Sequence, residues 1–307
     1  MKVFIATSTF GDFSNESIDH LRQNELDVCL NKLGRKLTDN ELIKFAEKCD
    51  SIIAGTENYS RRVLERLPHL KVISRLGIGM DNIDIEATKN KGIKIYKTKT
   101  TPAPAVAELV LALMIDVSRH ISHSNQLVKN GNWNKKMGFL LFGKTLGIIG
   151  LGTIGKELVK VSKGFGFHIL AFDKQEDVNF ADEHDVTYCD LYTLLSKSHF
   201  ISIHLNLSDE TKYFIDEEKI KLMNPESILI NTSRGEVLDE KALYGALKTE
   251  KLGGAGLDVF HQEPYSGPLT GLDNVVLTPH IGAYAKELRI QMEMEAAENL
   301  IRGLNEV

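Results

Sequence analysis

The sequence predicts an α/β protein with two domains, each built on a parallel sheet with helices on its faces. Three observations lead to this fold class. Short apolar runs alternate with amphipathic stretches along most of the chain, as they do in consecutive strand–helix units. The proline-rich segment Thr100–Pro104 interrupts this alternation, because proline lacks an N–H group and restricts the residue before it. At 307 residues, the chain is also long for a single hydrophobic core.

The first domain is predicted from four apolar runs with helices between them. The expected strands are Lys2–Ala6, Ser51–Ala54, Lys71–Ser74 and Ile93–Tyr96. One helix is expected to begin near Thr38, because Thr38 and Glu41 have the spacing of a capping box and apolar residues follow at helical spacing.

The second domain is predicted to begin with a strongly apolar helix from Ala105 to His120, followed by a polar segment that contains Asn130–Trp133. From Lys144, strand–helix units continue to Pro279. Residues 283–304 then have the apolar spacing of one terminal helix, which we expect to pack back on the first domain. The expected domains are therefore residues 1–99 plus 284–307, and residues 100–283.

The composition excludes several classes of protein. A net charge of -5 argues against a nucleic-acid surface, which needs clustered lysine and arginine. The run Met1–Ala6 lacks the features of a signal peptide, and no stretch has the roughly 18 apolar residues of a membrane helix. Cys29, Cys49 and Cys189 lie far apart, which favours reduced thiols. We expect a cytoplasmic protein with no bound metal and no nucleic-acid or membrane partner.

A glycine-rich motif follows directly after the apolar run Thr145–Ile149 and precedes a helical pattern. In this context Gly150 allows a tight turn, Gly152 lets the backbone approach a pyrophosphate, and Gly155 permits close packing of helix on strand. The motif therefore predicts a dinucleotide-binding site.

Two further features refine this site. The helix that follows begins with Thr153 and Ile154, whose free N–H groups and partial positive charge suit phosphate. The next strand ends in Asp173, about 20 residues after the glycines, where a carboxylate binds ribose hydroxyls and would repel a 2′-phosphate. We therefore expect NAD as the cofactor, and not NADP.

Three later segments each carry a charged residue after a predicted strand. Arg234 follows the first of these strands, Glu263 the second and His280 the third. The carboxyl ends of strands form the ligand crevice of an open α/β sheet, so these side chains can converge although they are distant in sequence.

Together these motifs resemble the D-isomer-specific 2-hydroxyacid dehydrogenase family, and most closely its bacterial phosphoglycerate dehydrogenase-like members. The resemblance runs essentially end to end. The segments that carry it are Arg75–Asp84, Ala105–Leu109, Gly147–Gly155, Asn231–Glu240, Gly256–Pro264 and Thr278–Gly282. It implies a Rossmann-type NAD-binding domain inserted into a smaller flavodoxin-like substrate domain, and hydride transfer at C2 of a small 2-hydroxy or 2-keto acid.

The resemblance also implies a role for each catalytic residue. His280 matches the acid–base histidine, which takes the hydroxyl proton on oxidation and returns it on reduction. Glu263 matches its carboxylate partner, which orients the imidazole and favours its protonated form. Arg234 matches the arginine that grips the substrate carboxylate and polarises the carbonyl group.

The other site residues follow from the same resemblance. The backbone N–H groups of Leu76, Gly77 and Ile78 match the loop that holds the substrate carboxylate, where glycine permits close approach. Cofactor contacts are implied, with Asp258 near the nicotinamide amide, for Leu205, Thr232, Ser233, Asp258, Gly282 and Ala283.

The choice of substrate depends on whether the first domain offers a cation for a phosphate group. Animal phosphoglycerate dehydrogenases carry an arginine in the loop after the second strand, whereas the equivalent segment Ala54–Asn58 has none, and the chain stops at Val307 without the regulatory domain of some relatives. Arg75 could supply a cation for phosphate, so D-3-phosphoglycerate is the first choice. The alternatives are a glyoxylate/hydroxypyruvate reductase, another small D-2-hydroxyacid dehydrogenase, or a non-enzymatic NAD-sensing scaffold resembling corepressors, which the complete Arg, Glu and His set disfavours.

The expected partner, besides the small acid substrate, is a second copy of the chain. In the family that the sequence resembles, the segment from Ala105 through Trp133 packs on another subunit. The helix at its start is apolar all round, which exceeds what one face of a lone domain needs. A homodimer with C₂ symmetry is therefore expected.

Overall fold

The computed structural model describes residues 1–307 and contains two compact units. Unit 1 comprises Met1–Pro102 and Tyr284–Val307, and unit 2 comprises Ala103–Ala283. Unit 2 is therefore an insertion in the chain of unit 1. None of the helices combines the length and the hydrophobicity that crossing a bilayer requires.

Unit 1 has a five-stranded parallel sheet with the order β2-β1-β3-β4-β5, which is the order of flavodoxin-like folds. Its strands are β1 (Lys2–Ile5), β2 (Asp27–Leu30), β3 (Ser51–Ala54), β4 (Val72–Arg75) and β5 (Lys94–Lys97). Its helices are α1 (Glu16–Gln23), α2 (Asp39–Ala46), α3 (Arg61–Glu65), α4 (Ile85–Asn90) and α12 (Lys286–Asn305). The predicted capping box is present, because the Thr38 hydroxyl and the Glu41 carboxylate each accept from the other's backbone N–H.

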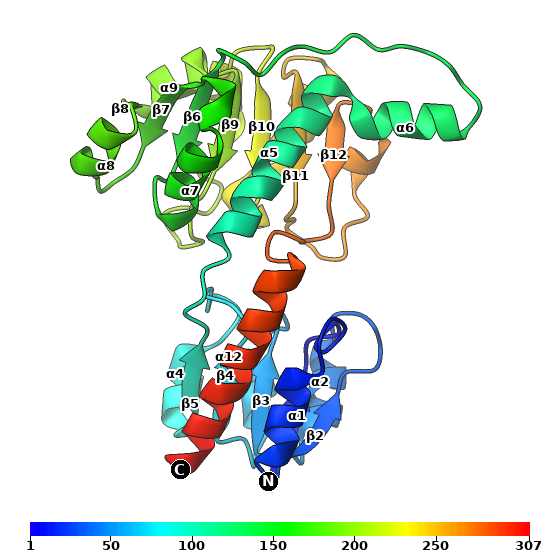
Figure 1. Cartoon of the computed structure of the whole chain (residues 1–307), viewed down its shortest axis with the longest axis vertical. Coiled ribbons are helices and arrows are strands. Elements are labelled where there is room, and N and C mark those ends of the chain that lie inside the picture. The colour runs from blue at the N-terminus through cyan, green and yellow to red at the C-terminus, as the bar shows by residue number, and fades with distance from the viewer. The chain divides into compact units, whose positions relative to one another are not determined.

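Two apolar layers cover the sheet of unit 1, because successive residues of each strand point to opposite faces. On one face, Val3 and Ile5 pack with α1 and with Met292 and Leu300 of α12. On the other face, Phe4 packs with residues of α2, α3 and α4. Figure 1 shows α12, at the C-terminal end of the chain, lying along this sheet.

Unit 2 has a seven-stranded parallel sheet with the order β12-β11-β10-β9-β6-β7-β8, which contains the Rossmann order with one added strand. Its strands are β6 (Thr145–Ile149), β7 (His168–Phe172), β8 (Val186–Tyr188), β9 (Phe200–Ile203), β10 (Ile228–Asn231), β11 (Gly254–Leu257) and β12 (Val275–Leu277). Its α-helices are α5 (Ala103–Arg119), α6 (Ile121–Lys129), α7 (Thr153–Val161), α8 (Val178–Glu183), α9 (Leu191–Lys197), α10 (Glu217–Leu222) and α11 (Glu240–Lys248). The expected fold class is confirmed.

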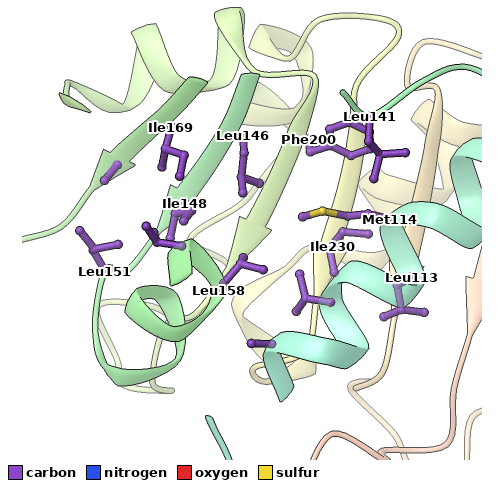
Figure 2. Packing of buried hydrophobic residues seen from close by; sticks show 14 of the residues in the cluster. Leu113, Met114, Leu141, Leu146, Ile148, Leu151, Leu158, Ile169, Phe200 and Ile230 are labelled. Atoms are coloured by element: carbon purple, nitrogen blue, oxygen red, sulfur yellow. The ribbon is translucent and has the colours of Figure 1, made fainter. Parts of the chain in front are cut away.

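Helix α5 belongs to the core of unit 2. Figure 2 shows its Met114 pointing toward Phe200 and Ile230 of the sheet, and Leu113 belongs to the same apolar cluster. Val106, Val110 and Val117 of the helix are buried in the same core, and Leu109, Leu111 and Ile115 pack against it partly buried. Leu109, Leu111 and Ile115 remain partly exposed, so the packing of this helix on a second subunit stays a prediction.

Two elements were not expected from the sequence. Strand β2 lies at the edge of the sheet of unit 1, where none of its residues is buried. Helix α6 occupies residues expected to be an irregular polar segment, and it also has no buried residue. In β2 only Val28 and Leu30 pack, partly buried, on the core, and α6 packs no buried residue, so neither gives a strong apolar pattern. The terminal helix α12 also begins three residues later than expected, at Lys286.

Candidate active site

The glycine-rich loop lies where the strand order of unit 2 reverses, between β6 and β9, which is the usual ligand crevice of such sheets. Gly150 has a φ of 94°, a left-handed conformation that favours glycine. A Cβ on Gly155 would lie 2.5 Å from the carbonyl oxygen of Gly150, so glycine is needed for the close packing of α7 on the turn. Both glycines are therefore explained by the protein's own geometry.

Gly152 is different, because a Cβ placed there would meet no protein atom within 4 Å. Gly152 and Thr153 are exposed, and α7 begins at Thr153, so the N–H groups of Thr153 and Ile154 belong to its first turn. Open space beside a helix N-terminus fits a pyrophosphate, which backbone N–H groups and the helix dipole stabilise.

Asp173 follows β7 and borders the same loop. Its carboxylate accepts the Leu151 N–H at 2.7 Å and the Gln175 N–H at 3.0 Å. It lines a cavity of about 550 Å³ together with Gly152, Lys156, Glu176 and Asp177, among others. The Lys156 ammonium is paired with Asp177, so the cavity presents a surplus of acidic groups. This environment suits ribose hydroxyls and opposes a 2′-phosphate.

We expect the Asp173→Ala variant to lose most of a preference for NADH over NADPH. Hydrogen bonds to a charged group contribute about 1.5–3 kcal/mol, so the ratio of kcat/KM values for the two cofactors should fall roughly tenfold or more. The matched control is Glu176→Ala, which changes an acid of the same cavity and should have a smaller effect. A wild-type preference for NADPH would contradict the expected role of Asp173.

His280 and Glu263 form a direct pair in unit 2. The His280 Nδ1 lies 2.9 Å from Glu263 Oε2 and 3.1 Å from Oε1. Both side chains are partly exposed. The carboxylate fixes the proton of the ring on Nδ1, which leaves Nε2 as the nitrogen that can exchange a proton with a ligand.

Asp258 holds the loop that carries His280. Asp258 is fully buried at the end of β11, and it accepts hydrogen bonds from the Thr278 hydroxyl at 2.6 Å and from the N–H groups of Ile281 and Gly282, both at 2.8 Å. Burial raises the pKa of Asp258, and these hydrogen bonds oppose that shift. Asp258 thus fixes the backbone directly after His280 and the side chain of Thr278 before it.

Arg234 is presented by a tight turn after β10. The side chain of Asn231 accepts from the Ser233 N–H and hydroxyl and donates to the carbonyl oxygen of Arg234 at 2.8 Å. Arg234 Nη1 also donates to the Ser233 carbonyl oxygen at 2.7 Å. The sequence did not predict this role for Asn231, although its position directly before the predicted polar turn was an available signal.

Gly235 brings Arg234 beside the segment that leads to Glu263. A Cβ on Gly235 would lie 2.0 Å from the carbonyl carbon of Phe260 and 2.4 Å from the backbone nitrogen of His261. The two backbones therefore touch, and the Phe260 N–H donates to Glu263 Oε1 at 3.2 Å. This contact places the arginine and the carboxylate on adjoining turns.

The other predicted cofactor residues of unit 2 lie on these same turns. Thr232 is nearly buried, and its hydroxyl has no hydrogen-bond partner in the protein, which suits a polar group of a cofactor. Leu205 follows β9 beside Gly150, while Gly282 and Ala283 follow His280. No group of three or more His, Cys, Asp or Glu side chains is placed to hold a metal ion.

The loop Leu76–Ile78 of unit 1 is built differently from what the sequence suggested. The Leu76 N–H donates to the Ala54 carbonyl oxygen at 2.9 Å, and the Gly77 N–H donates to the Thr98 hydroxyl at 3.1 Å. Two of the three N–H groups expected to hold a carboxylate are thus used inside unit 1. Ile78 is exposed, and the structure records no protein acceptor for its N–H.

The chain is similar in sequence and structure to several known proteins. The chain is 41% identical over 271 residues to a glyoxylate reductase of Thermococcus litoralis, covering 85% of this chain and 82% of that one. It is 41% identical over 274 residues to a D-3-phosphoglycerate dehydrogenase of Methanocaldococcus jannaschii, covering 87% of this chain and 52% of that one. The crystal structure of the TT0316 protein from Thermus thermophilus matches with a TM-score of 0.90 at 32% identity, covering 100% and 97% of the two chains.

A family model described as the NAD-binding domain of D-isomer specific 2-hydroxyacid dehydrogenases matches residues 111–282, which are more than half of the chain. The expected enzyme class and the expected cofactor, NAD, are thereby confirmed. The chain belongs to the D-isomer specific 2-hydroxyacid dehydrogenase family.

Proposed function

We propose that this enzyme reduces a small unphosphorylated 2-keto acid, such as glyoxylate or hydroxypyruvate, to the D-2-hydroxy acid. The observation that carries this proposal is that the side chain of Arg75 is buried and hydrogen-bonded within unit 1. Arg75 is the residue that the sequence analysis expected to bind a substrate phosphate. Its guanidinium is nearly buried and donates to the carbonyl oxygens of Ala54 and Leu76. The similarity to a glyoxylate reductase supports the same choice.

The residues of unit 2 suit such a reduction. Arg234 binds the substrate carboxylate and polarises the keto group, since a guanidinium pairs with a carboxylate through two hydrogen bonds. His280 gives the proton on Nε2 to the keto oxygen, while Glu263 holds Nδ1 and stabilises the ring. NADH, when bound, supplies the hydride that C2 accepts.

The test is a panel of 2-keto acids with NADH, followed by loss of absorbance of the reduced cofactor. Glyoxylate or hydroxypyruvate should give the highest kcat/KM. D-3-phosphoglycerate, the first choice from the sequence, remains the second candidate because of the similarity to a D-3-phosphoglycerate dehydrogenase. A higher kcat/KM for 3-phosphohydroxypyruvate would overturn the proposal in its favour. If none of the acids is turned over, the result would favour the alternative function, a non-enzymatic NAD-sensing scaffold.

We also propose that the protein forms a homodimer through α6 and the segment 130–142. This stretch exposes large apolar side chains, among them Trp133, which is 81% exposed, and Met137, which is 92% exposed. Such a concentration of apolar surface on one segment is typical of a protein interface.

Light scattering at micromolar concentration is expected to give twice the chain mass of 34.3 kDa. The double variant Trp133→Glu, Met137→Glu should shift the mass to that of one chain, because two charges would be buried at the interface. Val178→Glu, which changes an exposed apolar residue of α8, serves as the matched control. A wild-type mass of about one chain would contradict the dimer.

A further inference from the structure

A lysine stands next to the carboxylate that we expect to bind the ribose of NAD. Lys174 directly follows Asp173 after the end of β7, and Asp173 accepts the Leu151 N–H of the glycine-rich turn. A cation at this place could pair with the 2′-phosphate of NADPH, because phosphate attracts the ammonium group of lysine as a point charge. Lys174 therefore conflicts with a preference for NADH unless its charge is already occupied.

The ammonium group of Lys174 is paired with a carboxylate from another loop. Its Nζ donates to Glu210 Oε2, and this hydrogen bond lowers the pKa of Glu210. The neighbours of Lys174 in the chain, Asp173 and Gln175, both line the cavity beside the glycine-rich turn, whereas Lys174 does not. The side chain of Lys174 is thus directed to Glu210 and away from the space next to Asp173.

The ion pair joins two loops across the glycine-rich turn. In the sheet of unit 2, β6 lies between β9 and β7. Lys174 follows β7 and Glu210 lies in the connection after β9, so the pair bridges the carboxyl end of β6, from which the turn emerges. An aromatic contact makes the same connection, because Phe172 of β7 stacks on Phe214, with ring centroids 6.2 Å apart. Two independent contacts therefore hold these loops together.

The turn that carries Glu210 is fixed by its own hydrogen bonds. The Thr211 hydroxyl donates to the Asn206 carbonyl oxygen at 2.6 Å and accepts from the Ser208 N–H at 2.8 Å. The backbone that presents Glu210 is ordered by these bonds, so only the two side chains have to be ordered when the ion pair with Lys174 forms.

The lysine that does line the cofactor cavity is also paired with an acid. Lys156, on α7, borders the cavity, and its ammonium group donates to the carboxylate of Asp177. Asp177 in turn caps α8 by accepting the Phe180 N–H at 3.1 Å. Lys156 and Lys174 are thus both engaged by carboxylates of the protein itself.

We propose that Glu210 is a specificity-determining residue for the cofactor, which holds Lys174 away from the 2′ position of the adenosine ribose so that NADH binds better than NADPH. Asp173 repels a 2′-phosphate, and Glu210 occupies the cation that would attract one. The inference concerns unit 2 alone and goes beyond the proposed function, because it does not depend on which keto acid the enzyme reduces.

The experiment measures the dissociation constants of NADH and NADPH by the fluorescence of the reduced nicotinamide, in wild type and in Glu210→Gln. Glutamine keeps the size of the side chain but lacks the charge that holds Lys174. NADPH should bind about threefold to tenfold more tightly to the variant, because the lysine can then pair with the 2′-phosphate. The dissociation constant of NADH should change by less than about twofold, since NADH has no phosphate at this position.

A double-mutant cycle tests whether Glu210 acts through Lys174. In the Lys174→Met background, Glu210→Gln should change the NADPH affinity by less than about twofold, because the residue through which it acts is gone. Asp209→Asn removes an exposed carboxylate from the same turn and is the matched control, which should also stay within about twofold of wild type. At about 1 M salt the gain in Glu210→Gln should largely disappear, because the Debye length falls to about 3 Å.

The results that would overturn the inference are distinct from those that test the proposed function. Melting temperatures verify that every variant is folded. An unchanged NADPH affinity in Glu210→Gln overturns the role of Glu210. An equal gain in the Lys174→Met background, or in Asp209→Asn, also overturns it, because the carboxylate would then act only as a repelling charge. None of these outcomes bears on the panel of 2-keto acids, so the proposed function stands or fails separately.

Discussion

Replacement of His280 by alanine is expected to lower kcat for keto-acid reduction by about a hundredfold to ten-thousandfold, the usual contribution of a positioned acid–base group. The Glu263 carboxylate holds Nδ1 of the ring at 2.9 Å, so only Nε2 remains to give a proton to the keto oxygen. Alanine removes that proton donor and leaves the glycine-rich loop of the cofactor site intact. NADH affinity, measured by the fluorescence of the reduced nicotinamide, should therefore change little.

His261→Ala is the matched control for this variant. His261 is also a histidine of unit 2, but it is exposed and stacks on the ring of Tyr213, with ring centroids 5.2 Å apart. Its loss should change kcat by less than about threefold, since it holds no reacting atom. Near-normal turnover in His280→Ala would remove His280 from the mechanism.

Gly235→Ala is expected to combine a loss of stability with a loss of activity. The added Cβ would lie 2.0 Å from the Phe260 carbonyl carbon, and backbone cannot move aside as a flexible side chain can. Overpacking of this kind costs about 1–3 kcal/mol or more, which lowers the melting temperature by several degrees in a domain of this size. Separation of the two turns would also move Arg234 away from the Glu263 turn, so kcat/KM should fall at least tenfold.

Gly245→Ala provides the contrast for that variant. Gly245 lies inside α11, and a Cβ there would meet no protein atom within 4 Å. Alanine is the better helix former by about 1 kcal/mol, so this variant should be slightly more stable and fully active. Thermal unfolding followed by circular dichroism measures both variants. Equal melting temperatures for the two would show that the contact of Gly235 with Phe260 is not as tight as the structure has it.

The sequence predicted the features of unit 2 that local geometry determines. Gly150 and Gly155 could be assigned from the sequence, because a strand, a tight turn and a helix follow one another directly within residues 145–161. Asp173 was identified by its distance from the same turn. Contacts between distant segments were not predictable in this way. Glycine is required at position 235 because the backbone of Phe260 lies against it. No spacing in the sequence indicates that these two segments are in contact.

The family resemblance predicted the contact between the two acid–base residues correctly, but it did not predict the hydrogen bonds of the substrate loop. His280 and Glu263 lie together as expected, since each follows a strand of the same sheet. For Leu76 and Gly77, resemblance gave the loop but not the hydrogen bonds, because their N–H groups are taken by Ala54 and Thr98. The burial of Glu57, which is 2% exposed, could not be foreseen either. A glutamate in a short connection is normally exposed, and only the packed structure shows otherwise.

The insertion of unit 2 into the chain of unit 1 has a consequence for synthesis on the ribosome. Residues 103–283 form one continuous stretch, so unit 2 has all of its strands as soon as that stretch has emerged. Unit 1 begins earlier but lacks α12, whose Met292, Ala296 and Leu300 fill one face of its sheet. Domains generally fold as units during translation, from the N-terminus onward. Here the order is reversed: the part of the chain made first completes its core last, after release of residues 286–305.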